Sequence, residues 1–281
     1  MSGHTQTYGH LSTDEHVHDH VTEQGEHIIS TDAKVSDIGR WLKRGWQDMA
    51  EMPGISFFYG AIMALSVVLV YFSFRNNPIH MFTIATVFVM LSPFLATGLY
   101  YAAKQLEEGN KPKLLDSMVS WKSNAGDIGF YAAVLGVITA AWAIFTPLLA
   151  AIVAQSHGLL IVDPSLGLMG FVLSEAGVKF MAYFVVLAVA LTAFVFTISV
   201  VTIPLLMKDK NIGAVQAMIL SFQISMENKF VMAVWASVIA VLIAIAIFSL
   251  GLGMLIVMPL LGYASWHAFT DLVKIVPASQ E

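Results

Sequence analysis

Long apolar runs without a charged residue constrain this chain more than any other feature. Four of them, and a fifth stretch of about double length, cover residues 55–74, 81–101, 128–154, 180–206 and 230–269. A helix of roughly 20 apolar residues crosses about 30 Å of hydrocarbon, and open sheets cannot stand in lipid. None of the runs alternates like a barrel strand. We expect Gly251 and Gly253 to divide the fifth stretch, which predicts an all-α integral membrane protein with six transmembrane helices.

The basic residues predict how these helices are oriented. With the N-terminus inside, twelve of the 14 Lys and Arg residues fall in the cytoplasm, and only Arg75 and Lys179 fall outside. Such a bias is typical of cytoplasmic loops. The first thirty residues have no Lys or Arg and no apolar core, so they do not form a secretory signal peptide. We therefore expect a multi-pass protein of the bacterial inner (cytoplasmic) membrane with both termini cytoplasmic.

Three amphipathic segments precede pairs of spans. The first carries Ile38, Trp41, Leu42, Gly45, Trp46 and Met49 on one face, before a bend at Pro53 and Gly54. Pro112 is expected to open the second, which carries Leu114, Leu115, Met118 and Val119, and Asn211 to cap the third, which carries Ile212, Val215, Ile219, Phe222 and Met226. Helices of this kind lie in the membrane interface. The chain is thus predicted as three hairpins, each preceded by an amphipathic interfacial helix.

A proline occupies a similar place in each returning span. Pro93, Pro204 and Pro259 leave the carbonyls of residues 89, 200 and 255 without their helical donors, and lipid cannot supply donors in their place. This predicts a small polar pocket near the cytoplasmic end, lined by Ser92, Pro93, Thr97, Thr202, Pro204, Pro259, Tyr263 and Ser265. The alternative is that each kink is repaired locally by Ser and Thr hydroxyls.

The N-terminal segment has a different composition from the rest of the chain. Residues 1–34 are expected to be a disordered, acidic, His-rich tail, and residues 35–276 the six-helix membrane domain. Three imidazoles, His16, His18 and His20, lie within five residues and could bind Zn, Cu or Ni weakly. The alternative is a tail in which the histidines are incidental.

Four separated segments carry a resemblance to a known family: residues 41–48 (WLKRGWQD), 201–206 (VTIPLL), 221–235 and 258–267 (MPLLGYASWH). Together, over residues 36–274, they resemble the bacterial membrane family DUF2189. The resemblance implies an inner-membrane protein without an established activity, and some relatives carry a cytochrome c oxidase label. It supplies no functional residues to carry over.

The residues argue against several kinds of chemistry. There is no cysteine, and six of the nine histidines precede the first span. His80 and His267 are predicted at opposite ends of the spans, so they cannot share a haem, while His80 and His157 are expected to be interfacial polar residues. Ser265, His267 and Asp271 are too close along one helix to form a catalytic triad, although His267 and Asp271 are expected to pair.

Two functions remain open from the sequence. No span contains an acid or a base, which argues against proton-coupled transport, and nothing suggests a nucleic-acid surface. We expect a non-enzymatic accessory or assembly protein of a membrane complex, conceivably respiratory, with lipid and another membrane protein as partners and no cofactor. The alternative is a passive transporter or lipid-handling protein with a cavity between the hairpins.

Overall fold

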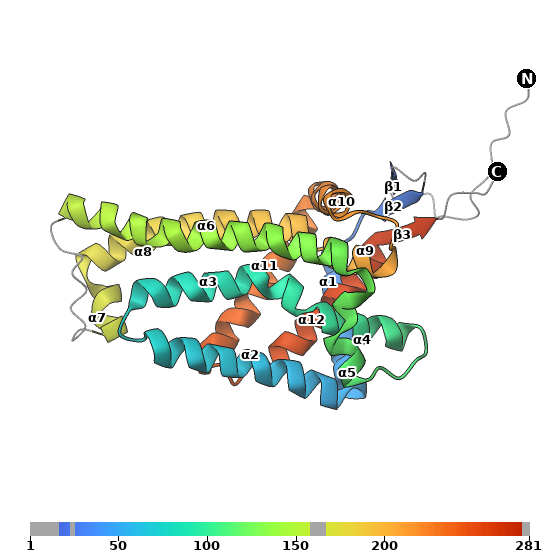
Figure 1. Ribbon diagram of the computed structural model, residues 1–281, viewed down its shortest axis with the longest axis horizontal. Helices are drawn as coiled ribbons and strands as arrows, with labels where there is room; N and C mark the ends of the chain where they lie inside the picture. The colour runs from blue at the N-terminus through green and yellow to red at the C-terminus, as the bar shows by residue number, and fades with distance from the viewer. Residues whose placement is uncertain (1–16, 23–25, 158–166, 277–281) are drawn as a thin grey trace, which may run out of the picture.

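The computed structural model of the chain describes residues 17–22, 26–157 and 167–276. Five helical stretches within them are long and apolar enough to cross a membrane. The helices that form them are α2 (Pro53–Phe74), α3 (Pro78–Leu95) with α4 (Thr97–Glu107), α6 (Ala125–His157), α8 (Glu175–Ser199) with α9 (Thr202–Lys208), and α11 (Lys229–Phe248). The long helices run side by side along the bundle (Figure 1). The chain is therefore a mainly helical membrane protein, as the apolar runs predict.

Besides these five stretches, the helix α12 (Met254–Leu272) lies inside the bundle and is the most enclosed of the long helices. Twelve of its residues are buried, and it packs against α1 (Val35–Glu51), α2, α4 and α11. Glycines permit two of these contacts. A Cβ on Gly45 of α1 would lie 2.8 Å from the backbone nitrogen of Ala264, and one on Gly60 of α2 would lie 2.7 Å from the carbonyl oxygen of Leu255. The backbones of α1 and α2 therefore lie directly against α12.

The returning helices α3 and α8 are interrupted near their ends. The helical conformation is interrupted at Ala96, between α3 and α4, and at residues 200–201, between α8 and α9. The hydroxyl of Ser92 donates to the carbonyl of Val89, at 2.7 Å, which Pro93 leaves without a helical donor. Pro204 lies in the first turn of α9, where no helical donor is needed. By contrast, α12 continues through Pro259 without a break.

Residues 75–77 join α2 to α3 at one end of the bundle. The short helix α7 (Gly167–Leu173) lies here (Figure 1), as does His80, whose imidazole contacts the Asn77 carboxamide at 2.9 Å. Residues 249–253, which join α11 to α12, lie alongside α2 before its end, since a Cβ on Gly251 would be 3.0 Å from the carbonyl oxygen of Ala64. Gly251 has a φ of +85°, a conformation that glycine adopts readily. The predicted break at this glycine is confirmed.

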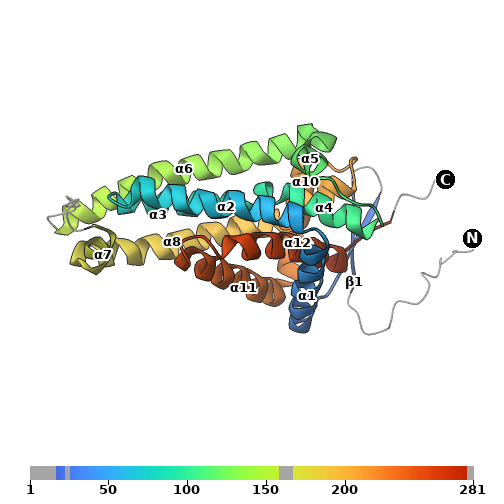
Figure 2. The same cartoon turned by 90° about the horizontal axis from the view of Figure 1, so that it is seen from below.

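The opposite end, which we call the basic end, carries most of the Lys and Arg residues. Helix α1 lies across the ends of the long helices (Figure 2). The second amphipathic segment is only a five-residue helix, α5 (Leu114–Met118), followed by a 3-10 turn, η1 (Ser120–Asn124). Lys113, and not Pro112, is the N-cap of α5. Similarly, α10 (Ala214–Glu227) is capped by Gly213, so the expected cap at Asn211 is wrong.

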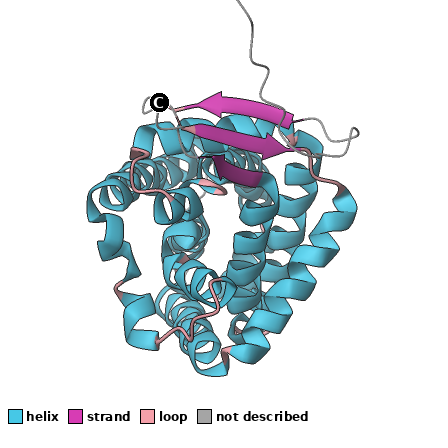
Figure 3. Cartoon of the chain, turned by 90° about the vertical axis from the view of Figure 1, so that its right-hand side faces the viewer, coloured by secondary structure: helices cyan, strands magenta, loops and turns pink. Residues whose placement is uncertain are grey.

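A three-stranded antiparallel sheet covers part of the basic end (Figure 3). Its strands are β1 (Val17–Val21), β2 (His27–Thr31) and β3 (Val273–Val276), in the order β1-β2-β3. Ile28 of β2 is fully buried and is paired with Ile275 of β3. The prediction that residues 1–34 are disordered is therefore wrong for 17–21 and 27–31, because strand pairing with the C-terminal segment and burial of Ile28 order them. The fold is not strictly all-α.

Candidate functional site at the basic end

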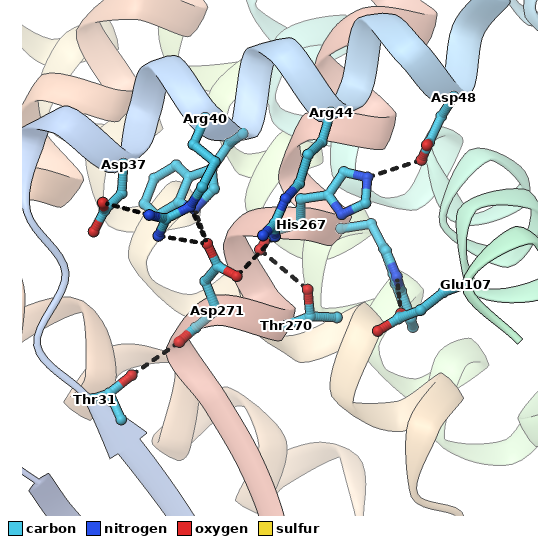
Figure 4. Close-up of polar contacts among 11 residues, drawn as sticks. Thr31, Asp37, Arg40, Arg44, Asp48, Glu107, His267, Thr270 and Asp271 are labelled. Carbon is cyan, nitrogen blue, oxygen red and sulfur yellow. Dashed lines mark hydrogen bonds and ion pairs between the residues drawn. The ribbon is translucent and has the colours of Figure 1, made fainter. Parts of the chain in front are cut away.

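Asp271, in the last turn of α12, is the centre of a polar network with α1 (Figure 4). Its carboxylate accepts hydrogen bonds from Nη2 of Arg40 at 2.9 Å, from Nε1 of Trp41 at 2.9 Å and from Nη1 of Arg44 at 2.9 Å. Trp41 is fully buried and meets Trp235 of α11 edge to face, with ring centroids 5.7 Å apart. One carboxylate thus joins α12 to two arginines and to a core tryptophan of α1.

The surroundings of Asp271 shift its protonation. Partial burial by itself would raise the pKa of the carboxyl, but the hydrogen bonds from Arg40, Trp41 and Arg44 outweigh burial and lower the pKa below 3.8. The hydrogen bond to Asp271 also raises the pKa of the Arg40 guanidinium. Asp271 is therefore a charged carboxylate at neutral pH, and its charge is matched by α1.

A second contact between α1 and α12 lies further along α1. Nε2 of His267 is 2.9 Å from Oδ2 of Asp48, and both side chains are largely shielded from solvent. The predicted pair between His267 and Asp271 is wrong. Each of them finds its partner on α1 because α1 lies along this face of α12 (Figure 4). Ser265, His267 and Asp271 do not form a triad, as their spacing predicts.

The N-terminal segment is tied to the same end by side-chain hydrogen bonds. Ser30 donates to Glu227 at 2.6 Å, the backbone N–H of Ala33 donates to Oδ1 of Asn228 at 2.8 Å, and Thr31 donates to the carbonyl of Asp271 at 2.8 Å. These bonds connect the segment around β2 to the end of α10, to the start of α11 and to α12. The sequence gives no local signal for them, because the partners are about 195 to 240 residues apart.

Two carboxyl groups meet beside the β1–β2 connection. Asn211 joins them, since its side chain donates to Oε1 of Glu26 at 3.1 Å and its backbone N–H donates to Oδ1 of Asp209 at 2.8 Å. The other oxygens, Oε2 of Glu26 and Oδ2 of Asp209, are shielded from solvent and have no donor among the described residues. A hydrogen bond with Asp209 raises the pKa of Glu26. The carboxyl of Glu26 is therefore protonated more readily in the folded chain than in an unfolded one.

The predicted metal ligands are only partly visible. His16 lies outside the described residues. His18 is 3.8 Å from Asp32, whereas His20 is 3.0 Å from Glu227, so the two imidazoles face different carboxylates. Within residues 17–22, 26–157 and 167–276, no group of three or more His, Asp or Glu side chains is arranged to hold a metal ion.

The hydroxyls of the predicted pocket have partners a few residues back along the chain or on a neighbouring helix. Thr97 donates to the carbonyl of Phe94, and Thr202 donates to that of Ile198. Tyr263 instead meets Ser56 of α2 at 3.1 Å, and Ser265 is within hydrogen-bond reach of Tyr100. Pro204 and Pro259 are buried and Pro93 is partly buried. The bonds of Thr97 and Thr202 are those expected from local repair of the kinks, whereas those of Tyr263 and Ser265 join neighbouring helices. A shared pocket stays a prediction.

Two surface pockets lie at the basic end, and neither is lined by the residues of the predicted pocket. The larger has a volume of about 820 Å³ and lies between the first turns of α6, the N-terminal half of α10 and the end of β1. The smaller, of about 260 Å³, is lined by Lys104, Glu107, Glu108, Lys208 and Trp266. Nε1 of Trp266 donates to Glu107 at 2.8 Å (Figure 4). The smaller pocket is therefore lined by side chains that already have partners.

Comparison with known proteins gives one match. No curated protein and no solved structure matches the chain. Of the four segments that carry the resemblance described above, residues 201–206 fall inside the matched region and the other three lie outside it. The match covers α3, α4, α5, η1, α6, α7, α8 and α9. Over residues 81–208, the chain matches the family model DUF2189, described as a predicted integral membrane protein, and the resemblance to this family is confirmed for that region.

Proposed function

We propose that the chain is a non-enzymatic accessory or assembly protein of a membrane complex in the bacterial inner membrane. The observation that carries the proposal is the enclosure of α12. Helices α1 and α2 contact its backbone at Gly45 and Gly60, and α4 and α11 pack on other parts of it. Helix backbones packed this closely leave no room for a solute between them. The packing at the centre of the bundle therefore supports a structural role.

The surface of the bundle also supports this role. The spans bury only 22–33% of their most apolar windows within the chain. Side chains such as Phe57, Leu65, Val137, Val186 and Phe248 are exposed on different helices. In a membrane this surface meets lipid or the spans of another protein, so a partner can pack around the outside of the bundle.

The network of charges at the basic end would hold the bundle in one shape for a partner. Arg40 and Arg44 on α1 are both committed to Asp271, and Asp48 is committed to His267. Committed groups of this kind position helices and are poor proton donors or acceptors for a substrate. The arrangement is that of a rigid support, with its partner surface outside the bundle.

Isolation of the tagged chain from its native membrane in a mild detergent tests the proposal. We expect another membrane protein at a fixed ratio, identified by mass spectrometry after chemical crosslinking. The control is an unrelated tagged protein of the same membrane, isolated at the same expression level. Recovery of lipid alone, or of the same proteins as in the control, would contradict the accessory role.

The alternative is a passive transporter or a lipid-handling protein with a cavity between the hairpins. It predicts flux of a small solute across proteoliposomes that contain the purified chain. It also predicts that filling the bundle near Tyr263 and Ser265 stops this flux. Solute flux above that of empty liposomes would favour this alternative over the accessory role.

A further inference from the structure

The larger pocket at the basic end is lined by both polar and apolar residues. Its walls come from three parts of the chain: His20 and Val21 of β1; Gly126, Asp127 and Phe130 of α6; and, before and along α10, Asn211, Gly213, Ala214, Val215, Gln216, Ile219, Leu220 and Gln223. At about 820 Å³ it is within the usual size range of small-molecule sites, roughly 300–1,000 Å³.

One part of the lining is apolar and exposed. Phe130 is 50% exposed, Val215 is 54% exposed and Ile219 is 52% exposed. Phe130 begins a row along the outer face of α6 that continues with Val137 and Ile144, both exposed. Residues seven apart lie on one side of a helix, and this helix forms one of the membrane-crossing stretches. The pocket therefore opens onto a surface suited to acyl chains.

The other part of the lining is polar and includes a carboxylate without a cationic partner among the described residues. Oδ1 of Asp127 accepts the backbone N–H of Ala214 at 2.9 Å and so caps the start of α10. Gln216 and Gln223 bring carboxamides, and the lining contains neither Lys nor Arg. A carboxylate favours an ammonium group, and carboxamide N–H groups can donate to phosphate oxygens.

We propose that this pocket holds the headgroup of a zwitterionic phospholipid that carries a primary ammonium, such as an ethanolamine lipid. The ammonium lies at Asp127, the phosphate lies at the carboxamides of Gln216 and Gln223, and the acyl chains follow Phe130 down the face of α6. A phospholipid with a negatively charged headgroup would place its charge against Asp127 with no Lys or Arg in the lining to balance it. The site is independent of the accessory role, since any bilayer supplies the ligand.

Native mass spectrometry of the full, delipidated chain measures this binding directly. The chain is titrated in detergent with phosphatidylethanolamine, phosphatidylglycerol or phosphatidylcholine of the same acyl chains. We expect phosphatidylethanolamine to bind about ten-fold more tightly than phosphatidylglycerol, the difference of one charge-assisted hydrogen bond. Equal binding of these two lipids would overturn the proposal.

Two variants place the binding in the pocket. Asp127→Asn keeps an oxygen for the cap on Ala214 but removes the charge, so it should lower phosphatidylethanolamine affinity about ten-fold and leave phosphatidylglycerol affinity no weaker. The matched control, Asp116→Asn, removes a charge from exposed residue 116 of α5, outside the pocket, and should change neither. Val215→Trp fills the pocket from an exposed position and should lower the binding of every lipid.

Thermal unfolding of the same samples separates loss of the fold from loss of the site. A variant that unfolds at the temperature of the unsubstituted chain reports on the site alone. If Asp127→Asn and Val215→Trp are both folded and both bind phosphatidylethanolamine as tightly as the unsubstituted chain, the pocket is not the site and the proposal is wrong.

Discussion

The carboxylate of Asp48 on α1 lies 2.9 Å from the imidazole of His267 on α12, one turn before Asp271 meets Arg40 and Arg44. These contacts, with the close approach at Gly45, hold α1 against α12 at the basic end. Helix α1 is therefore part of the core of the protein, although its sequence is typical of a helix that lies on a membrane surface.

Replacement of Asp271 tests this attachment. Asp271→Ala leaves Arg44 without its carboxylate partner, leaves Arg40 with Asp37 alone, and leaves the buried Nε1 of Trp41 without an acceptor. Unfolding should therefore become about 2 kcal/mol easier. Asp271→Asn keeps an acceptor and should cost about half as much. Chemical unfolding in detergent, followed by tryptophan fluorescence, measures both. Asp116→Asn, at an exposed carboxylate, is the control, and equal stability of all four proteins would contradict the role of Asp271.

The lowered pKa of Asp271 also predicts the effect of acid. Because the folded protein favours the charged carboxylate, its contribution is complete at neutral pH and is lost as the pH falls below 3.8. The stability difference between the unsubstituted protein and Asp271→Asn should therefore shrink between about pH 4 and pH 2. A difference that stays constant over this range would show that the charge does not matter.

Glu26 predicts the opposite dependence for the N-terminal hairpin. Its raised pKa means that the folded hairpin favours the protonated carboxyl of Glu26, so this contribution is present at acid pH and is lost as the pH rises above 4.5. Glu26→Gln supplies a neutral donor to Asp209. At pH 8 it should raise the free energy of opening of residues 17–31 by about 1 kcal/mol, which slows their amide exchange. At pH 5 the effect should be smaller. Glu51→Gln, at an exposed position of α1, serves as the control. An effect of Glu26→Gln that does not change with pH would contradict easier protonation of Glu26 in the folded hairpin.

Two glycines of α1 form a matched pair for packing. A Cβ on Gly39 meets no atom within 4 Å, whereas one on Gly45 would lie 2.8 Å from the backbone of Ala264. Gly39→Ala should therefore stabilise the protein by about 0.5–1 kcal/mol through helix propensity. Gly45→Ala should destabilise it by about 1–3 kcal/mol because α1 must move away from α12. Similar unfolding curves for the two variants would mean that α1 does not lie against α12.

Much of the fold could be predicted from the sequence, because lipid imposes strong rules on local pattern. The apolar runs predict helices close to their observed bounds, and the glycine pair predicts the turn between α11 and α12. The sheet could not be predicted in this way. Strand β1 is five residues of His, Asp and Val, and its order depends on β2, whose partner β3 is more than 240 residues further along the chain.

The candidate site was predicted less well, for a related reason. His267 and Asp271 are one helical turn apart, which suggests a local pair, but α1 offers each of them a better partner. The pocket between α6 and α10 has little sequence signal, since Asp127 comes from a different segment from Val215 and Gln223. The only local sign was the exposed apolar stripe of α10, which includes Val215 and Ile219.

Cysteine accessibility in intact cells tests most directly whether six helices cross the membrane with the basic end in the cytoplasm. The chain has no cysteine, so single cysteines can be placed at Asn76 and Leu252, in the turns after α2 and α11, and at Asn110 and Lys210 at the basic end. A membrane-impermeant maleimide should label Asn76→Cys and Leu252→Cys in intact cells, and Asn110→Cys and Lys210→Cys only after permeabilisation. Labelling of Asn76→Cys without Leu252→Cys, or of Asn110→Cys in intact cells, would contradict this arrangement.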